Sequence, residues 1–488
     1  MTHVYARKHV AGPLVVAVWA MFVAADSKAQ DWPQWRGPNR DGKAAGFSAP
    51  ESWPKELTQQ WQIEVGDGVA TPALVGERLY VFTRQAGDEI LRCVSAADGK
   101  EIWQDKYPAD PVRGAAGGFP GPRSSPTVAE GKVVALGAQG IISCWDAESG
   151  KLLWRNEKTK GRVPRFATSS SPIVVGDVAI FQIGSERDGG IVAYDLASGE
   201  EKWKWSESGP AYGSPTAIKI GDTQAIVAPT DGRMVILAAA DGEELWNISY
   251  SQGRYNAASP LVDGATIIYA GPNRGSTAQK IERKGDEVEA KELWVNTESS
   301  VQFNTPVLKD GMLFGLSNLN SLFCVDTESG KTVWNAPLGA AAARDEGRPA
   351  EGGERRDAQR GDAQRGDAQR GDAQRGEEQQ RGQRGEGQDQ PRDAQRPRPG
   401  GERGQRGGGR GFGGRGGGGG GYGSVVDAGS VLIALVPSGE LTVFAPGKEF
   451  KKLAEYKVAE RGTYAYPIAS GKRLFIKDQN SLTLWTAP

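Results

Sequence analysis

Between residues 59 and 338, the hydrophobic positions come in short runs that are separated by turns. The stretch 124–154 reads SSPTVAEGKVVALGAQGIISCWDAESGKLLW and contains four such runs, with turns at EG, AQG and ESG. Short runs rich in Val and Ile and bounded by Gly, Asp and Ser are typical of β-strands. Nothing of helical period competes with them in this region, so the pattern predicts an all-β fold.

The same four-strand unit recurs, and each full copy carries a glycine four residues before a tryptophan. The pairs are Gly99/Trp103, Gly150/Trp154, Gly199/Trp203, Gly242/Trp246 and Gly330/Trp334. The units open on Ser-Pro or Thr-Pro steps at Thr71, Ser125, Ser171, Ser214, Ser259 and Thr305. With Trp294 included, successive tryptophans are 40 to 51 residues apart. A four-stranded unit of this length is the signature of a β-propeller blade.

Two less regular copies, at 424–456 and 465–488, complete the series. The last copy has only three strands, and the run QQWQIEV at 59–65 supplies a fourth, because its Trp61 matches the tryptophan of the repeat. Pairing of the N- and C-terminal strands closes the ring and removes a free sheet edge. The sequence therefore predicts an eight-bladed propeller of four-stranded blades, with the closing strand and blades one to six in 59–338 and blades seven and eight in 424–488.

The glycine–tryptophan turn is expected to be architectural rather than catalytic. Glycine accepts the backbone conformation of a tight turn, and the tryptophan can pack between neighbouring blades. The fifth unit stretches this turn to ERKGDEVEAKELW (282–294), so its outer hairpin should be the least regular. Cys93, Cys144 and Cys324 occupy equivalent places in three units, which predicts small buried thiols beyond disulfide reach of one another.

The unit A-x-D-x-x-[ST]-G-x-x-x-W resembles the tryptophan-docking repeat of pyrroloquinoline-quinone (PQQ) dehydrogenases and of the PQQ-like propellers typified by BamB. The resemblance covers nearly all of 59–338 and, more weakly, 424–488. It implies the propeller fold but leaves activity open, since one group is enzymatic and the other is a scaffold. The segment DWPQWRGPNRDG at 31–42 resembles the leader of exported PQQ-like proteins, so residues 30–58 are expected to pack on the ring.

Residues 1–29 have the pattern of a secretory signal peptide: a positive start, an apolar run too short to span a bilayer, and the small-x-small site Ser27-Lys28-Ala29. No other segment is long and apolar enough to cross a membrane. We therefore expect a monomer exported to the periplasm or the extracellular space. Both histidines, His3 and His9, lie in the signal peptide, which excludes Ser-His-Asp and Cys-His catalysis and histidine-bound metals from the processed chain. The net charge of −1 indicates no specific nucleic-acid partner.

Residues 339–423 interrupt the repeats between blades six and seven. This insertion holds seventeen arginines, fourteen acidic residues, no lysine and almost no large apolar side chains, so it is expected to be disordered. Beyond Glu402 its arginines continue alone among glycines. Two interpretations stay open: a tolerated linker, or weak binding to an anionic surface or polymer.

Propellers bind ligands where loops reach the innermost strands at the mouth of the central channel. The loops before the Ser-Pro and Thr-Pro steps carry aromatic, arginine and asparagine side chains, which are expected to converge on one face. They are Phe119, Arg123, Arg165, Phe166, Tyr212, Arg254, Tyr255, Asn256, Phe303, Asn304 and Tyr464. Aromatic and arginine side chains are enriched at binding hot spots. The alternative is that they plug the channel and satisfy one another.

Two functions follow from these residues and the resemblance. The first is a non-catalytic scaffold that binds a protein or a cell-envelope polymer at the channel mouth, with no catalytic residue, metal or cofactor. The second is a PQQ- and calcium-dependent dehydrogenase of alcohols or sugars. The loops offer Asn256 and Asn304 as amide ligands but no carboxylate, and the chain lacks both a Cys-Cys pair and a CxxCH haem motif.

Overall fold

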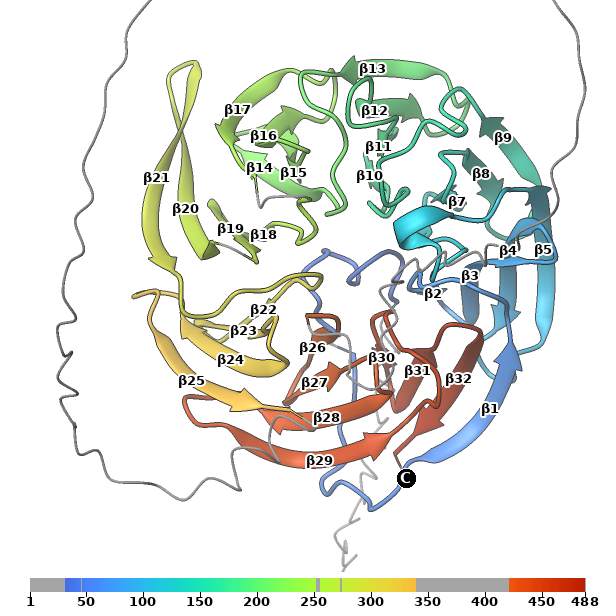
Figure 1. The fold of residues 1–488 in the computed structure, drawn as a ribbon, viewed down its shortest axis with the longest axis vertical. Helices are drawn as coiled ribbons and strands as arrows, with labels where there is room; N and C mark the ends of the chain where they lie inside the picture. The colour runs from blue at the N-terminus through green and yellow to red at the C-terminus, as the bar shows by residue number, and fades with distance from the viewer. Residues whose placement is uncertain (1–30, 45, 252–254, 273, 339–420, 488) are drawn as a thin grey trace, which may run out of the picture. The chain divides into compact units, whose positions relative to one another are not determined.

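The computed structural model describes residues 31–44, 46–251, 255–272, 274–338 and 421–487. Eight antiparallel four-stranded sheets follow one another around a ring, each in chain order from the channel outward (Figure 1). The predicted eight-bladed propeller is therefore confirmed. The predicted signal peptide and all of the insertion except residues 421–423 lie outside the described residues, as does the whole of a second unit, 345–410.

The strands of the first four blades have the following bounds. Blade 1 contains β2 (Ala73–Val75), β3 (Arg78–Gln85), β4 (Asp88–Ser95) and β5 (Glu101–Pro108). Blade 2 contains β6 (Thr127–Ala129), β7 (Lys132–Leu136), β8 (Ile142–Asp146) and β9 (Leu152–Asn156). Blade 3 contains β10 (Ile173–Val175), β11 (Val178–Ile183), β12 (Gly190–Asp195) and β13 (Glu201–Trp205). Blade 4 contains β14 (Thr216–Ile220), β15 (Thr223–Pro229), β16 (Arg233–Ala238) and β17 (Glu244–Ser249).

The remaining four blades complete the ring. Blade 5 contains β18 (Leu261–Asp263), β19 (Thr266–Gly271), β20 (Gly275–Lys284) and β21 (Glu287–Asn296). Blade 6 contains β22 (Val307–Lys309), β23 (Met312–Leu316), β24 (Ser321–Asp326) and β25 (Thr332–Pro337). Blade 7 contains β26 (Ser424–Ala428), β27 (Val431–Leu435), β28 (Glu440–Ala445) and β29 (Lys451–Lys457). Blade 8 contains β30 (Ile468–Ser470), β31 (Arg473–Lys477), β32 (Ser481–Thr486) and, outermost, β1 (Thr58–Glu64).

The ring closes as the sequence predicts, by pairing of the N-terminal strand with the C-terminal one. Strand β1 runs antiparallel to β32, with Trp61 opposite Leu484. The Trp61 indole N–H donates to the carbonyl of Ala96 in blade 1 at 3.3 Å. Blade 8 is thereby complete and tied to its neighbour.

The glycine–tryptophan turn joins each blade to the next. The indole N–H of Trp103 donates to the carbonyl of Ala147 in blade 2 at 3.2 Å, and Trp154 makes the equivalent bond in blade 3 at 3.1 Å. Gly150 lies flat against the indole of Trp103, so close that a Cβ would sit 2.4 Å from it. Each glycine thus packs on the tryptophan of the preceding blade and not on the one four residues later. Close packing explains why the turn needs a glycine, and the cross-blade hydrogen bond explains why the strand needs a tryptophan.

The same cross-blade contact recurs around the ring. Trp203 is buried, and its indole N–H donates to the carbonyl of Ala239 in blade 4 at 2.9 Å. A Cβ on the facing glycine would lie 2.5–3.1 Å from the tryptophan in four further pairs: Gly99 against Trp61, Gly199 against Trp154, Gly242 against Trp203, and Gly330 against Trp294.

Trp334 departs from this arrangement, although the repeat spacing makes it equivalent to the others. Its indole N–H does donate to the next blade, to the carbonyl of Gly447 at 3.0 Å. A Cβ on Gly447 would nevertheless meet nothing within 4 Å, so this glycine does not pack on the indole. Instead the ring of Phe450 lies 5.3 Å and that of Phe444 6.3 Å from the indole centroid. Blade 7 has APGKEF where the other blades have the glycine turn, and its phenylalanines supply the packing.

Trp246 departs as well, because blade 5 replaces the turn of the repeat. Strands β20 and β21 each have ten residues, which confirms the predicted irregular hairpin (Figure 1). A Cβ on Gly285, in the turn of this hairpin, would meet nothing within 4 Å. Trp246 is half-buried and packs in the apolar layer between blades 4 and 5, with Tyr269, Ile281 and Val288. The equivalence of the five tryptophans in sequence therefore does not extend to Trp246 and Trp334, since the blades that follow them lack the turn.

The core consists of apolar layers between facing sheets rather than one central mass. Between blades 3 and 4, for example, Ile180 and Ile191 pack with Val235 and Leu237. The three cysteines are free and buried, as predicted. The described residues include one short 3₁₀ helix, η1 (Gly114–Ala116), and no helix long and apolar enough to cross a membrane.

A belt of hydroxyl groups surrounds the channel at the Ser-Pro and Thr-Pro steps. In each case the main-chain N–H of one blade donates to the side-chain oxygen of the next. The bonds of this hydroxyl belt run from Thr71 to Ser125, Ser125 to Ser171, Ser171 to Ser214, Ser214 to Ser259 and Ser259 to Thr305, over 2.6–3.0 Å.

Blade 7 lacks this step, and the phenol of Tyr466 in blade 8 replaces it. The N–H of Thr305 donates to the Tyr466 hydroxyl at 3.3 Å, and the N–H of Tyr466 donates to Thr71 at 2.9 Å. A longer side chain therefore spans the missing member, and the belt is closed.

The leader, residues 31–57, crosses the ring (Figure 1) and contacts the C-terminal ends of innermost strands. The N–H of Trp32 donates to Leu74 in blade 1, and the N–H of Ala44 donates to the carbonyl of Asp427 in blade 7, each at 2.7 Å. Trp32 is fully buried. The segment between these contacts enters the channel.

Arg36 from the leader reaches the hydroxyl belt from inside the channel. Its guanidinium donates to the carbonyls of Thr305 at 2.5 Å and Pro306 at 2.6 Å, and to the Tyr466 hydroxyl at 3.0 Å. The side chain is 0% exposed. Arg36 thus binds blades 6 and 8 around the position where blade 7 lacks its belt residue.

Arg40 makes the corresponding contacts on the other side of the channel. Its guanidinium donates to the carbonyls of Ser171, Pro172 and Pro215 in blades 3 and 4. Burial lowers its pKa from the usual 12.5 to about 9. No sequence pattern marks these two arginines as channel residues, because their partners lie more than a hundred residues away.

We predict that Gly150→Ala destabilises the propeller more than Gly131→Ala. Both glycines have positive φ, +73° and +69°, but only at Gly150 would a Cβ meet a neighbour. The positive φ alone costs an alanine about 1–2 kcal/mol, and forced overpacking costs about 1–3 kcal/mol more. Thermal unfolding followed by tryptophan fluorescence measures both variants. Equal losses of Tm would show that the glycine–tryptophan contact is not tight.

We also predict that Arg40→Met lowers the free energy of unfolding by about 2–4 kcal/mol, because three buried carbonyls lose their donor. Arg40→Lys should fall between Met and the wild type, since an ammonium keeps the charge but not the planar fork. The exposed Arg113→Met is the control and should change stability by less than about 0.5 kcal/mol. Urea unfolding measures the series, and an unaltered Arg40→Met protein would contradict a structural role for the leader in the channel.

Candidate binding site at the channel mouth

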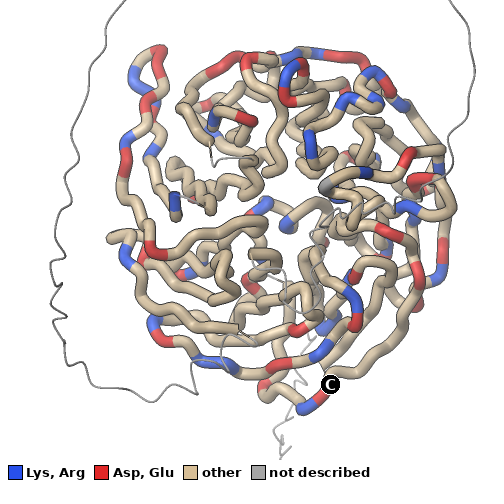
Figure 2. The backbone as a smooth tube through the Cα atoms, in the orientation of Figure 1, with Lys and Arg blue, Asp and Glu red and all other residues tan. Residues whose placement is uncertain are grey.

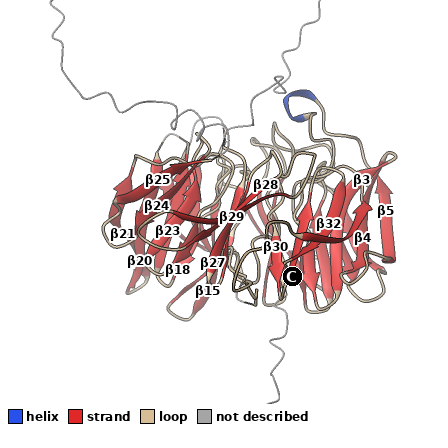
Figure 3. Cartoon of the chain, turned by 90° about the horizontal axis from the view of Figure 1, so that it is seen from below, coloured by secondary structure: helices blue, strands red, loops and turns tan. Residues whose placement is uncertain are grey.

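The loops that join the outermost strand of one blade to the innermost strand of the next lie on one face of the ring. The inter-blade loops lead into the first residues of the innermost strands, whereas the leader contacts the other ends of these strands. The loops and the leader contacts therefore lie at opposite ends of the innermost strands. In the edge-on view, η1 marks the face that carries the loops (Figure 3). This face holds the predicted channel mouth.

Seven of the eight inter-blade loops each bring one aromatic side chain to the mouth, and together these side chains form a contiguous cluster. We call this set the mouth cluster: Phe119, Phe166, Tyr212, Tyr255, Phe303, Tyr422 and Tyr464. All seven are partly exposed. Six of them come from the loops singled out by sequence, so the expected convergence on one face is present in the structure.

The rings contact one another around the mouth. Phe303 stacks between Tyr255 and Tyr422, with centroid separations of 5.4 and 4.1 Å. Tyr464 meets Tyr422 edge to face at 5.2 Å, and Phe119 meets Tyr464 in the same way at 4.7 Å. The stacked pairs use ring faces and the edge-to-face pairs use both faces and edges, so the rings are packed against one another.

Tyr422 is the member that sequence reasoning missed. It lies in the last three residues of the predicted insertion, next to Gly421, whose carbonyl accepts a hydrogen bond from the main chain of Phe303 at 3.2 Å. The N–H of Gly421 donates to the side chain of Asn320 at 3.3 Å. The detectable signal was a tyrosine just before an innermost strand, the position that the other members of the cluster occupy.

Arg123 closes the circuit of aromatic rings between Phe119 and Phe166. Its guanidinium donates to the carbonyls of Phe119, Phe166 and Ala116, each at 2.9 Å. Burial lowers its pKa to about 10. The arginine holds two inter-blade loops together and leaves a positive charge beneath the cluster.

The other predicted residues divide into surface and interior positions. Arg165 is exposed and lies over the ring of Phe166, with 5.5 Å between the guanidinium carbon and the ring centroid. Asn256 and Asn304 are buried, and their amide groups donate to main-chain carbonyls, including Thr230 at 2.6 Å and Leu316 at 2.8 Å. Both amides therefore support loops rather than face the mouth. Arg254 lies outside the described residues.

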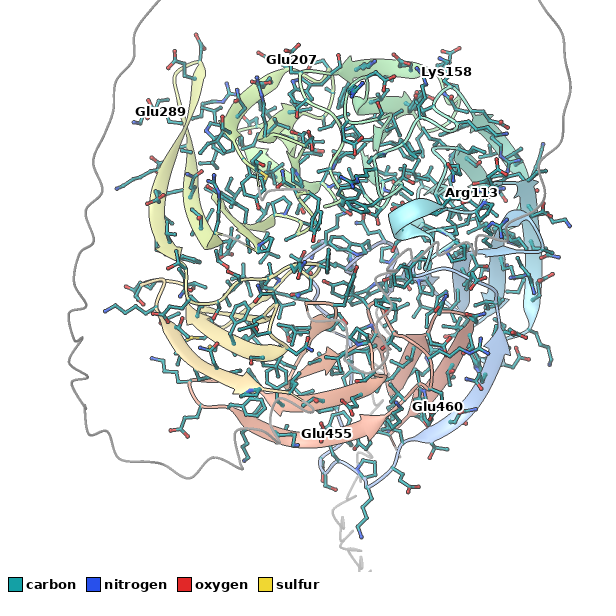
Figure 4. All side chains as sticks on the ribbon, in the orientation of Figure 1. Arg113, Lys158, Glu207, Glu289, Glu455 and Glu460 are labelled. Atoms are coloured by element: carbon teal, nitrogen blue, oxygen red, sulfur yellow. The ribbon has the colours of Figure 1, made fainter. Side chains whose placement is uncertain are left out.

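Acidic side chains occur in several of the inter-blade loops, including those that carry Asp67, Glu298 and Glu460. Glu186 accepts a hydrogen bond from the main-chain N–H of Arg165 at 2.6 Å, and partial burial together with Glu186 raises the pKa of Asp231. Most other charges lie around the outer edge of the ring, where Lys158, Glu289 and Glu455 project outward (Figures 2 and 4). In the part of the chain that the structure describes, no three His, Cys, Asp or Glu side chains lie close enough to hold a metal ion.

Comparison with known proteins identifies the family. The family model described as outer membrane protein assembly factor BamB matches residues 51–214 and 87–336, which together cover more than half of the chain. BamB of Burkholderia pseudomallei is 29% identical over 149 residues, which cover 30% of this chain and 33% of that protein. Quinohemoprotein alcohol dehydrogenase of Comamonas testosteroni is 29% identical over 157 residues, 31% of this chain and 22% of that protein. The matched part thus spans a third or less of either relative.

Solved structures extend the likeness in fold over nearly the whole chain. The quinohemoprotein alcohol dehydrogenase of Comamonas testosteroni superposes with a TM-score of 0.59 at 14% identity, covering 96% of this chain and 82% of that chain. BamB from Moraxella catarrhalis gives 0.53 at 12% identity, covering 88% of this chain and 99% of that chain. Such low identities indicate a common fold and no more. By its repeat, its eight blades and the family match, the chain belongs to the BamB family of PQQ-repeat β-propellers.

Proposed function

We propose that this chain is an exported, non-catalytic propeller that binds a protein or cell-envelope polymer through its channel mouth. The observation that carries the proposal is the mouth cluster, in which seven consecutive inter-blade loops each contribute one partly exposed aromatic ring. Aromatic and arginine side chains dominate binding energy at interfaces. A family match to proteins described as outer membrane assembly factors supports a partner in the cell envelope.

The alternative is a PQQ- and calcium-dependent dehydrogenase, which the alcohol dehydrogenase relative favours. The residues present do not fit that cofactor. A calcium ion requires several oxygen ligands, usually with carboxylates among them. Here the inward carbonyls of blades 3, 4 and 6 bind guanidinium groups, and the Nδ2 groups of Asn256 and Asn304 donate to main-chain carbonyls. The Oδ1 of Asn304 is buried without a hydrogen-bond partner, but among the described residues no group of three His, Cys, Asp or Glu side chains accompanies it to hold a metal ion. The positive charge of Arg123 further disfavours a cation at the mouth.

Titration with PQQ and Ca²⁺ tests the alternative directly. We expect no saturable quenching of tryptophan fluorescence up to about tens of micromolar PQQ, because the channel is filled by Arg36 and Arg40. Calcium-dependent quenching that saturates would contradict the scaffold proposal and lead to assays with alcohols and sugars.

Site-specific photo-crosslinking in the native host tests the mouth as the binding surface. Leu319 is 77% exposed in the turn that leads to Asn320, which bonds to Gly421 beside the mouth cluster, whereas Leu453 is exposed on the outer strand of blade 7. With p-benzoylphenylalanine in place of each leucine, we expect specific adducts from position 319 and none from 453. Adducts only from position 453 would move the binding surface to the outer edge, and adducts from neither would argue against a scaffold.

A further inference from the structure

Three arginines in and beneath the mouth carry charges that no acidic side chain compensates. Among the described residues, the arginines that form ion pairs are Arg92, Arg155, Arg162 and Arg473. Arg36, Arg40 and Arg123 bond instead to main-chain carbonyls and to uncharged side chains. Buried charges without a counter-ion are costly, so an anion nearby would be stabilising.

These charges lie directly under the mouth cluster. Arg36 bonds to Thr305 and Tyr466, and the cluster members Phe303 and Tyr464 precede these two residues by two positions each. Arg123 bonds to the carbonyls of two further members. Because the walls of the channel are protein of low dielectric, the positive potential of the arginines is focused toward the mouth.

The exposed parts of the cluster also suit an anion. Ring edges carry the positive end of the aromatic quadrupole, so an edge that is not used in one of the T-shaped contacts attracts negative charge. The hydroxyls of Tyr212 and Tyr255 each accept a hydrogen bond, from the N–H of Phe166 and the side-chain amide of Gln302, whereas those of Tyr422 and Tyr464 have no hydrogen-bond partner among the described residues. Burial raises the pKa of Tyr422 to about 12, so its hydroxyl remains a neutral donor.

Two carboxyl groups next to Tyr212 disfavour an anion on that side of the mouth cluster. Glu186 and Asp231 border Tyr212, on the blade 3 and 4 side of the mouth. Tyr422 and Tyr464 lie on the opposite part of the circuit, whereas Arg123 lies between the two parts, because it bonds to the carbonyls of both Phe119 and Phe166. An anionic group would therefore sit over Tyr422 and Tyr464.

The main chain around the channel offers nothing to a peptide. The N–H groups of the belt residues are bonded to neighbouring hydroxyls, and the inward carbonyls of blades 3, 4 and 6 are bonded to the leader arginines. A peptide at the mouth would therefore pair its N–H and C=O groups only with side chains and water, because these main-chain groups are already used. A sugar has no such backbone, and its hydroxyl groups pair readily with phenols.

We infer that the mouth binds the carboxylate-bearing sugars of an acidic polysaccharide. This inference rests on the proposed scaffold function and names the chemistry of its partner. The carboxylate faces the positive potential of Arg123 and Arg36, and the sugar hydroxyls bond to Tyr422 and Tyr464.

Calorimetric titration of the full-length processed protein with a galacturonic acid hexasaccharide tests this inference, in buffer containing EDTA to exclude calcium bridging. We expect saturable binding that weakens as salt is raised, and no binding of the neutral cellohexaose. Tyr422→Phe and Tyr464→Phe keep the rings but remove one hydroxyl, so each should weaken binding about two- to tenfold. Lys158→Gln, on the outer edge of the ring, is the matched control and should leave the affinity unchanged.

The remaining outcomes contradict the inference in distinguishable ways. Failure of the wild-type protein to bind the uronate, or equal binding of cellohexaose, would overturn the assignment of an acidic sugar. Equal or tighter binding of hexaglutamate would overturn it in favour of an acidic peptide. Adducts from position 319 without uronate binding would leave the scaffold function standing and reject only this partner, whereas an absence of adducts would count against the scaffold itself.

Discussion

The hydroxyl belt around the channel is the constraint on which the rest of the structure depends. Before each innermost strand of blades 1 to 6, a Ser or Thr hydroxyl accepts a hydrogen bond from the main chain of the preceding blade. These bonds fix the separation of the innermost strands at the radius where blades are closest. The proline that follows most belt hydroxyls has no N–H to satisfy, so its carbonyl is free to face the channel. That geometry creates the acceptors that Arg36 and Arg40 use.

The two arginines explain why the leader belongs to the propeller. Without the leader, the inward carbonyls of Ser171, Pro215 and Pro306 would be buried acceptors that lack their arginine donors. A single segment that crosses the ring satisfies them from the centre, and continues into β1, the strand that closes blade 8. One stretch of chain, the leader together with β1, therefore both fills the channel and completes the outer strand of blade 8.

The fold was predictable because its determinants are local and repeated. The Gly150 turn and the closing strand appear in the sequence as short patterns with a fixed period, although the period hides the different surroundings of Trp246 and Trp334. The site was predictable only in part. Six cluster members stand in equivalent loops, four to eight residues before an innermost strand, but Arg36 bonds to a residue 269 positions away and no period reveals it. The asparagines of the loops had the right chemistry for ligands, yet burial directs their amides to the main chain.

The two interpretations of the mouth, binding surface and plug, are compatible because they use different parts of the same rings. Stacking of Phe303 with Tyr255 and Tyr422 occupies aromatic faces and closes the channel. The same packing orders the ring edges and the hydroxyls of Tyr422 and Tyr464, which then need little reorganisation to meet a ligand. A loosely packed mouth would have to lose side-chain entropy on binding. Packing of the rings thus preorganises the surface above the channel, and the uncompensated arginines below support the proposed preference of that surface for negative charge.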